Sequence, residues 1–134
     1  MLIPHGTVIA VVDGEKLELH RNAGNEAAPE IVPMAAPKLH EHNRDSGARH
    51  ISSAANPTGH LLDEDAHAAA VAAWLHQQVV SRNIEHLIVV APPRTLGELR
   101  RRYDNALKAT LLSELDKEMT GRTGQDILEA LQSK

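Results

Sequence analysis

An apolar run that ends in two prolines is the feature that most constrains how this chain folds. Residues 86–90 (His-Leu-Ile-Val-Val) are too few and too β-branched for a helix, and Ala91-Pro92-Pro93 follows them directly. A proline cannot continue a central strand, but it suits the first turn of a helix, where its missing N–H is not needed. Beyond the prolines, apolar residues recur at i, i+3 and i+7, which predicts a helix over residues 94–105. A buried strand therefore leads into a helix whose N-terminus favours an anion, a common place for sites in α/β sheets.

The core of this fold has to be aliphatic. The 134 residues include no Phe, one Trp (Trp74) and one Tyr (Tyr103). Val, Ile, Leu and Ala therefore supply the buried volume, and we expect Trp74 to anchor it. The length is that of one domain.

Three strands are predicted before the apolar run. Residues 7–12 are apolar and β-rich, Asp13-Gly14 is a two-residue turn signal, and residues 16–20 alternate at period two, which together predict a hairpin. Residues 31–34 predict a third strand, and Pro33 favours a position at the edge of the sheet. The next segment, residues 36–61, is rich in Gly, Ser, Asn, Pro and His, and predicts a long mobile loop.

Two further helices and one strand complete the prediction. A helix over residues 63–82 opens with Asp63-Glu64-Asp65, as the macrodipole prefers. One side of this helix, suited to packing against a sheet, carries Ala66, Ala70, Ala73, Trp74 and Gln77.

Residues 109–115 form either a last strand or the continuation of a helix. We favour a strand, because Met119-Thr120-Gly121 then provides a loop into a final helix over residues 123–131. Thr123 and Asp126 would cap that helix in an imperfect capping box. The order βββ-α-β-α-β-α describes a single α/β domain over residues 1–134, with a mixed central sheet in two or three layers.

Composition excludes several classes of function. The absence of Cys excludes disulfides, zinc–thiolate sites and thiol catalysis. The formal net charge of −4 argues against indiscriminate binding to DNA or RNA. No segment approaches the roughly 20 apolar residues of a membrane span, and the first apolar run is interpreted as a strand rather than a signal peptide. We expect a cytoplasmic protein with no cofactor, no DNA partner and no membrane span, with a homodimer as an open alternative.

Residues 91–100, Ala-Pro-Pro-Arg-Thr-Leu-Gly-Glu-Leu-Arg, resemble the signature of a bacterial family, the proteins required for attachment to host cells. Val11-Val12-Asp13-Gly14, Gly47-Ala48-Arg49-His50 and residues 115–120 resemble other parts of that family, so the resemblance spans nearly the whole chain. It implies a ribonuclease H-like α/β fold, similar to the middle domain of archaeal and eukaryotic peptide-chain release factors. It also implies a role at the ribosome or on tRNA. Residues 40–60 contain no Gly-Gly-Gln tip, with which release factors help water reach the ester, so we expect binding rather than termination.

Several basic residues are candidates for contacts to phosphate or RNA, since guanidinium groups suit phosphate oxygens. One patch could contact an RNA backbone through charge, or could be a solvated face paired with Glu98 and Asp104. It consists of Arg94, Thr95, Arg100, Arg101, Arg102 and Lys108. The binding residues that we predict are Arg44, Arg49, His50, Arg94 and Thr95.

Metal binding and catalysis are weaker hypotheses. His40 and His42, with Glu41 and with His50 or His60, could hold a divalent metal, or could belong to a solvated loop. Asp13 could be the first ligand of a ribonuclease H-like pair of magnesium ions, or could simply form the hairpin turn. The possible partner carboxylates of Asp13 are those of Glu64, Asp65, Asp104 and Asp116.

Three functions follow from these readings. The leading one is a non-catalytic or weakly catalytic domain that acts at the ribosome or on tRNA. The second is a hydrolase of peptidyl-tRNA or another RNA ester in which His50 positions water. The third is a host-cell attachment or protein-interaction module. In each case Gly97 is expected to let helix and sheet approach closely, so that Gly97→Val destabilises the domain.

Overall fold

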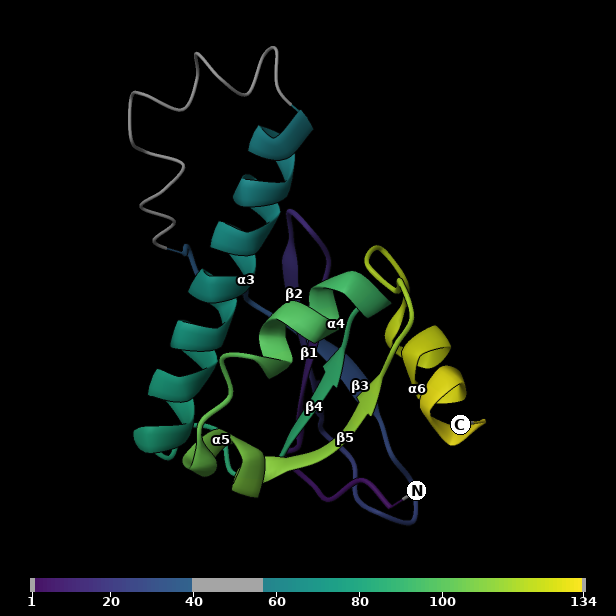
Figure 1. Ribbon diagram of the computed structural model, residues 1–134. Coiled ribbons are helices and arrows are strands. Elements are labelled where there is room, and N and C mark those ends of the chain that lie inside the picture. The colour runs from purple at the N-terminus through teal and green to yellow at the C-terminus, as the bar shows by residue number, and fades with distance from the viewer. Residues whose placement is uncertain (1, 40–56, 134) are drawn as a thin grey trace.

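The computed structural model describes residues 2–39 and 57–133, and a five-stranded mixed sheet lies at its centre (Figure 1). The sheet has the order β3-β2-β1-β4-β5, in which β1 pairs antiparallel with β2 and β2 with β3, while β1, β4 and β5 run parallel. The strands are β1 (Val8–Val12), β2 (Leu17–Asn22), β3 (Ile31–Met34), β4 (Leu87–Val90) and β5 (Leu111–Leu115). Pro33 therefore lies in an edge strand, as predicted. An edge strand has a neighbour on one side only, so it tolerates a residue without an N–H.

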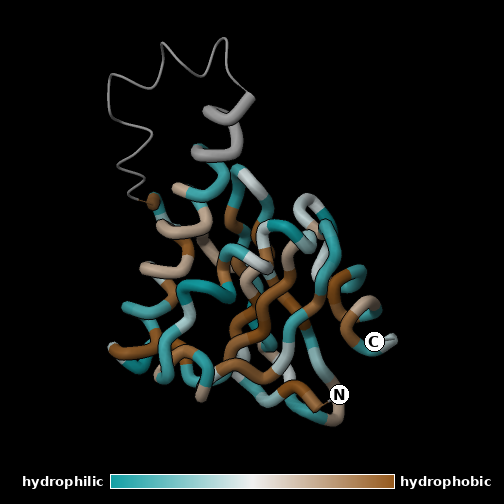
Figure 2. Tube along the Cα trace, viewed as in Figure 1, coloured by the Kyte–Doolittle hydropathy of each residue, from teal (hydrophilic) through white to brown (hydrophobic). Residues whose placement is uncertain are grey.

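Helices cover both faces of the sheet. Three of them, α3 (Pro57–Val80), α4 (Pro93–Arg100) and α5 (Asn105–Thr110), pack on one face, and α6 (Gly124–Gln132) packs on the other (Figure 1). Alternate residues of the central strands enter the two cores: Ala10 and Val89 face α3, whereas Ile9 and Ile88 face α6. The apolar strands are enclosed by more polar helices (Figure 2). The expected single α/β domain with a mixed sheet is confirmed, and it has three layers.

The long helix α3 differs from its prediction in two ways. It begins at Pro57 rather than Asp63, because a proline at the first helical position opens a helix as readily as an acidic first turn. The predicted loop is thus wrong over residues 57–61, and residues 40–56 lie outside the described part of the chain. The predicted side of α3 is only partly right: Ala66 is buried and Trp74 packs against the core, but Ala73 and Gln77 are exposed. Alanines on every side of α3 obscured the apolar stripe, which consists of Ala68, Val71, Ala72 and Leu75.

The helix predicted over residues 94–105 ends earlier, at Arg100, and a further helix that was not predicted begins at Asn105. Asp104 has an extended backbone, and its Oδ1 accepts the N–H of Leu107 at 2.9 Å, so it is the N-cap of a new helix, α5. The favoured strand over residues 109–115 is confirmed from Leu111 onward. The first hairpin also differs, because residues 13–16 form a four-residue loop instead of a two-residue turn. The predicted capping box of Thr123 and Asp126 is confirmed at the start of α6.

Gly97 has no neighbour that requires its small size. A Cβ placed on Gly97 would meet no heavy atom within 4 Å outside its own helix turn, so the close approach of helix and sheet expected there is wrong. Glycine is a poor residue inside a helix because it loses more backbone freedom on folding than alanine does. We expect Gly97→Ala to raise the free energy of unfolding by about 0.5–1 kcal/mol in urea titrations. A lower free energy of unfolding would contradict the open environment of Gly97.

Candidate functional site

The carboxyl ends of the parallel strands carry Asp13, the predicted catalytic carboxylate. Asp13 Oδ1 accepts the backbone N–H groups of Glu15 at 2.7 Å and of Lys16 at 2.6 Å. The Thr120 hydroxyl, from the loop that follows β5, donates to Asp13 Oδ2 at 3.0 Å. The two carboxylate oxygens therefore join the hairpin to the loop that follows β5. This is the structural role in the turn that the sequence offered as the alternative to catalysis.

The protonation of Asp13 reflects these bonds. Burial alone would raise the pKa of Asp13, but the N–H groups of Glu15 and Lys16, the Thr120 hydroxyl and the nearby His67 together hold it below the ordinary value of 3.8. A carboxylate with a lowered pKa stabilises the folded protein above its unfolded pKa, and this contribution is lost as the pH falls through the folded pKa.

We therefore expect Asp13→Asn to be less stable than the original protein near neutral pH, and the difference to shrink as the pH falls below 3.8. Urea unfolding of both proteins at about pH 7 and at about pH 3 measures this difference. If the two proteins differ in free energy of unfolding by the same amount at both pH values, the charge of Asp13 does not contribute to stability.

Of the five predicted binding residues, the structure describes two, Arg94 and Thr95, and both lie at the start of α4. Arg94 is exposed, and its guanidinium is 2.9 Å from Asp65 Oδ1 and 3.9 Å from Glu64 Oε2, both on α3. Thr95 is only 7% exposed. Arg94 therefore already has carboxylate partners where a phosphate contact was expected, and Thr95 offers little surface to a ligand.

The remaining candidates are placed as follows. His40, His42, Arg44, Arg49 and His50 lie outside the described residues. Within the described part, no group of three or more His, Asp or Glu side chains is arranged to hold a metal ion. No helix there is long and apolar enough to span a membrane. Of the possible partners of Asp13, Asp65 is paired with Arg94, and Asp104 caps α5.

The arginines near the end of α4 are also paired with carboxylates. Arg100 lies beside Glu114 of β5, with Nε at 3.0 Å and Nη2 at 2.9 Å from Oε1. The Tyr103 hydroxyl donates to the other oxygen of Glu114 at 3.1 Å, and burial, with Glu114 beside it, raises the pKa of Tyr103. Arg101 pairs with Glu98 at 3.2 Å, one turn back on the same helix. Arg101 therefore fits the alternative prediction of an exposed arginine that is paired with Glu98.

We call this set of charged side chains the α4 surface. It is formed by α3, α4, the link after α4, and β5. Its members are Glu64, Asp65, Arg94, Glu98, Arg100, Arg101, Arg102 and Glu114.

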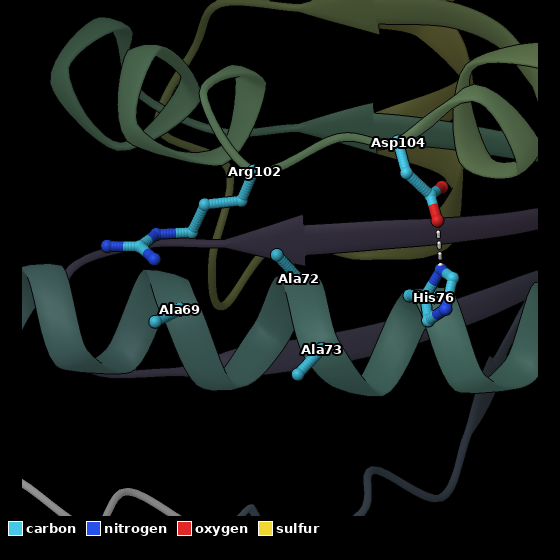
Figure 3. A pocket seen from close by; sticks show the side chains of 6 residues that line it. All are labelled: Ala69, Ala72, Ala73, His76, Arg102 and Asp104. Carbon is cyan, nitrogen blue, oxygen red and sulfur yellow. Dashed lines mark ion pairs between the residues drawn. The ribbon is translucent and has the colours of Figure 1, made fainter.

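A groove of about 330 Å³ borders the α4 surface, between α3 and the link from α4 to α5 (Figure 3). Its floor consists of three alanines of α3, and its sides carry Arg102 toward one end and the pair His76–Asp104 toward the other (Figure 3). His76 Nδ1 is 2.5 Å from Asp104 Oδ2, and the other oxygen of Asp104 caps α5. Because Asp104 is held from two sides, it fixes the orientation of the imidazole at the mouth of the groove.

A family model described as "Protein required for attachment to host cells" matches residues 8–131. The chain belongs to this family. The match runs from β1 to the last turn of α6, and it includes the α4 surface and the groove. A search of curated proteins finds no match to the chain.

The protein thus has a polar site that its sequence revealed only in part. The arginines of α4 were predicted as a charged face, but His76 was not singled out. The available signal was the spacing of Ala69, Ala72, Ala73 and His76, which places three small residues and one histidine on a single strip of α3. The pairing of His76 with Asp104 spans two elements and leaves no pattern in the sequence.

Proposed function

We propose that this protein is a non-catalytic domain that binds another protein through its α4 surface, and that this binding is needed for attachment to host cells. One observation carries the proposal. The α4 surface contains four arginines and four carboxylates, so its formal charge is zero, and three of the arginines are in ion pairs. The family description supports the biological setting.

A balanced surface of this kind suits a protein better than a nucleic acid. Nucleic-acid backbones bind through unpaired cations that replace condensed counterions. Here a phosphate approaching Arg94 or Arg100 would meet Asp65 or Glu114 at the same place. A protein partner can instead match both signs, and arginine is enriched in protein–protein interfaces.

The experiment for this proposal compares adhesion to host cells by a strain that carries the gene, a deletion strain and the complemented deletion strain. The proposal predicts a loss of adhesion on deletion and its return on complementation. Unchanged adhesion of the deletion strain would overturn it. Cell fractionation of the complemented strain tests the cytoplasmic location expected from the sequence.

Binding at the ribosome or on tRNA is the second candidate, and two observations favour it. Within the described residues, Arg102 is in no ion pair, so a phosphate could approach it at the end of the groove. The antiparallel strands β1–β3 joined to parallel β4 and β5 also support the ribonuclease H-like, release-factor-like fold that the family resemblance implies.

Co-sedimentation with ribosomes at low and at moderately high salt tests the second candidate. Salt-sensitive co-sedimentation that is lost in Arg49→Ala/Arg94→Ala would favour the ribosome over a protein partner. The hydrolase alternative depends on His50, which lies outside the described residues. It stays a prediction, and loss of turnover with retained binding in His50→Ala would support it.

A further inference from the structure

A second groove, of about 300 Å³, lies beside β2 and β3, at the end of the sheet away from β5. It plays no part in the proposed function. It is formed by β2, the end of β3 and the loop before α6, and we call it the β2–β3 groove. Its walls are mainly apolar, and Met34, at the end of β3, is 38% exposed there. β3 pairs with β2 only from Leu19 onward, so Leu17 and Glu18 have β1 on one side and no strand of the described residues on the other.

His20 is the unusual residue of the β2–β3 groove. His20 lines the groove, yet only 6% of the residue is exposed. Among the described residues, none provides a hydrogen-bond partner for His20 Nδ1. Buried polar atoms almost always have a partner, so this nitrogen calls for one from outside the protein.

The charges around the β2–β3 groove favour an uncharged ligand. Burial lowers the pKa of His20, although Glu18 opposes that effect, so the imidazole is neutral at pH 7. At the rim, Glu18 and Arg122 carry opposite charges. The Glu18 carboxylate also accepts the N–H of Gly121, with its two oxygens at 3.0 and 3.2 Å. Neither an anion nor a cation is therefore preferred.

We propose that the β2–β3 groove binds a small uncharged organic molecule that has an apolar ring or chain and one hydroxyl group, with the hydroxyl bonded to His20. A hydroxyl both donates and accepts, so it pairs with a neutral imidazole in either tautomer. The apolar body of the ligand covers Met34 and its apolar neighbours. The groove is at the small end of known ligand pockets, which suits a molecule of about one ring.

Phenol is the probe for this proposal, with benzene as the matched molecule that lacks the hydroxyl. Titrations are followed through the methyl resonance of Met34 in the full chain. We expect saturable shifts, and up to about tenfold tighter binding of phenol than of benzene, which is the usual worth of one hydrogen bond. In His20→Leu this preference should disappear while benzene still binds.

Ala36→Trp is the second variant, because Ala36 is exposed and lines the β2–β3 groove, so a larger side chain fills the groove without entering the core. It should abolish the binding of both probes. Three results would each overturn the proposal: no saturable shift in the original protein, equal binding of phenol and benzene by the original protein, or unchanged phenol binding by Ala36→Trp. A preference for phenol that persists in His20→Leu would overturn the assignment of His20.

Discussion

Replacing Asn22 by alanine will destabilise the protein by about 3 kcal/mol. Asn22 is fully buried at the end of β2, and its amide group donates to the carbonyl of Ile3 at 2.8 Å and that of Pro4 at 3.3 Å. Its Oδ1 accepts the N–H groups of Gly24 at 2.9 Å and Glu30 at 2.8 Å. Alanine removes these four bonds. The Pro4 carbonyl still accepts from the hydroxyl and N–H of Thr7, but the Ile3 carbonyl and the N–H groups of Gly24 and Glu30 lose the partner that Asn22 provides. A buried group left without a partner costs about 1–3 kcal/mol.

This loss is large against a total stability of about 5–15 kcal/mol for a domain of this kind. Urea unfolding of the original protein and of Asn22→Ala measures it. Asn25→Ala is the matched control, because Asn25 lies in the same loop and is exposed, with one side-chain bond to the N–H of Ala28. The control should lose less than about 1 kcal/mol. Equal losses in the two variants would contradict the anchoring role of Asn22.

Gly124→Ala should destabilise the protein by about 2–3 kcal/mol. A Cβ on Gly124 would lie 2.1 Å from the carbonyl oxygen of Ile31 and 2.9 Å from its carbonyl carbon. These are backbone atoms of β3, so no side-chain rotation relieves the overlap, and α6 has to move away from the sheet. That movement weakens the packing of Ile127 and Leu131 in the second core.

Gly97→Ala provides the control for Gly124→Ala, since the same chemical change is made in a helix with open space around it. The two variants should shift the free energy of unfolding in opposite directions, with Gly97→Ala the more stable one. A Gly124→Ala protein as stable as the original would show that α6 does not pack closely on β3.

Local patterns predicted most of the fold. The two central strands, β1 and β4, are short apolar runs that end just before Asp13-Gly14 and before Ala91-Pro92-Pro93, and both cores are built on them. The early end of α4 and the start of α5 were missed because the helical pattern continues to residue 105, whereas Asp104 caps a new helix through its bond to the N–H of Leu107. The start of α3 was missed because Pro57 lies in a polar segment that reads as a loop.

The candidate site was less predictable than the fold. Its arginines were visible in the sequence, but their partners come from other elements: Asp65 lies 29 residues before Arg94, and Glu114 lies 14 residues after Arg100. Spacing along one helix indicated the Arg101–Glu98 pair alone. The same limit applies to His76 and Asp104, which only the packing of α3 against α5 brings together.

The most direct test of the proposed protein-binding α4 surface is adhesion by the deletion strain complemented with Arg101→Glu/Arg102→Glu. Both arginines are exposed, so folding should be kept, and circular dichroism verifies it. Arg21→Glu/Arg82→Glu changes the net charge equally at exposed arginines outside the α4 surface. We predict that adhesion is lost with the first pair and kept with the second. Full adhesion with Arg101→Glu/Arg102→Glu would contradict the account.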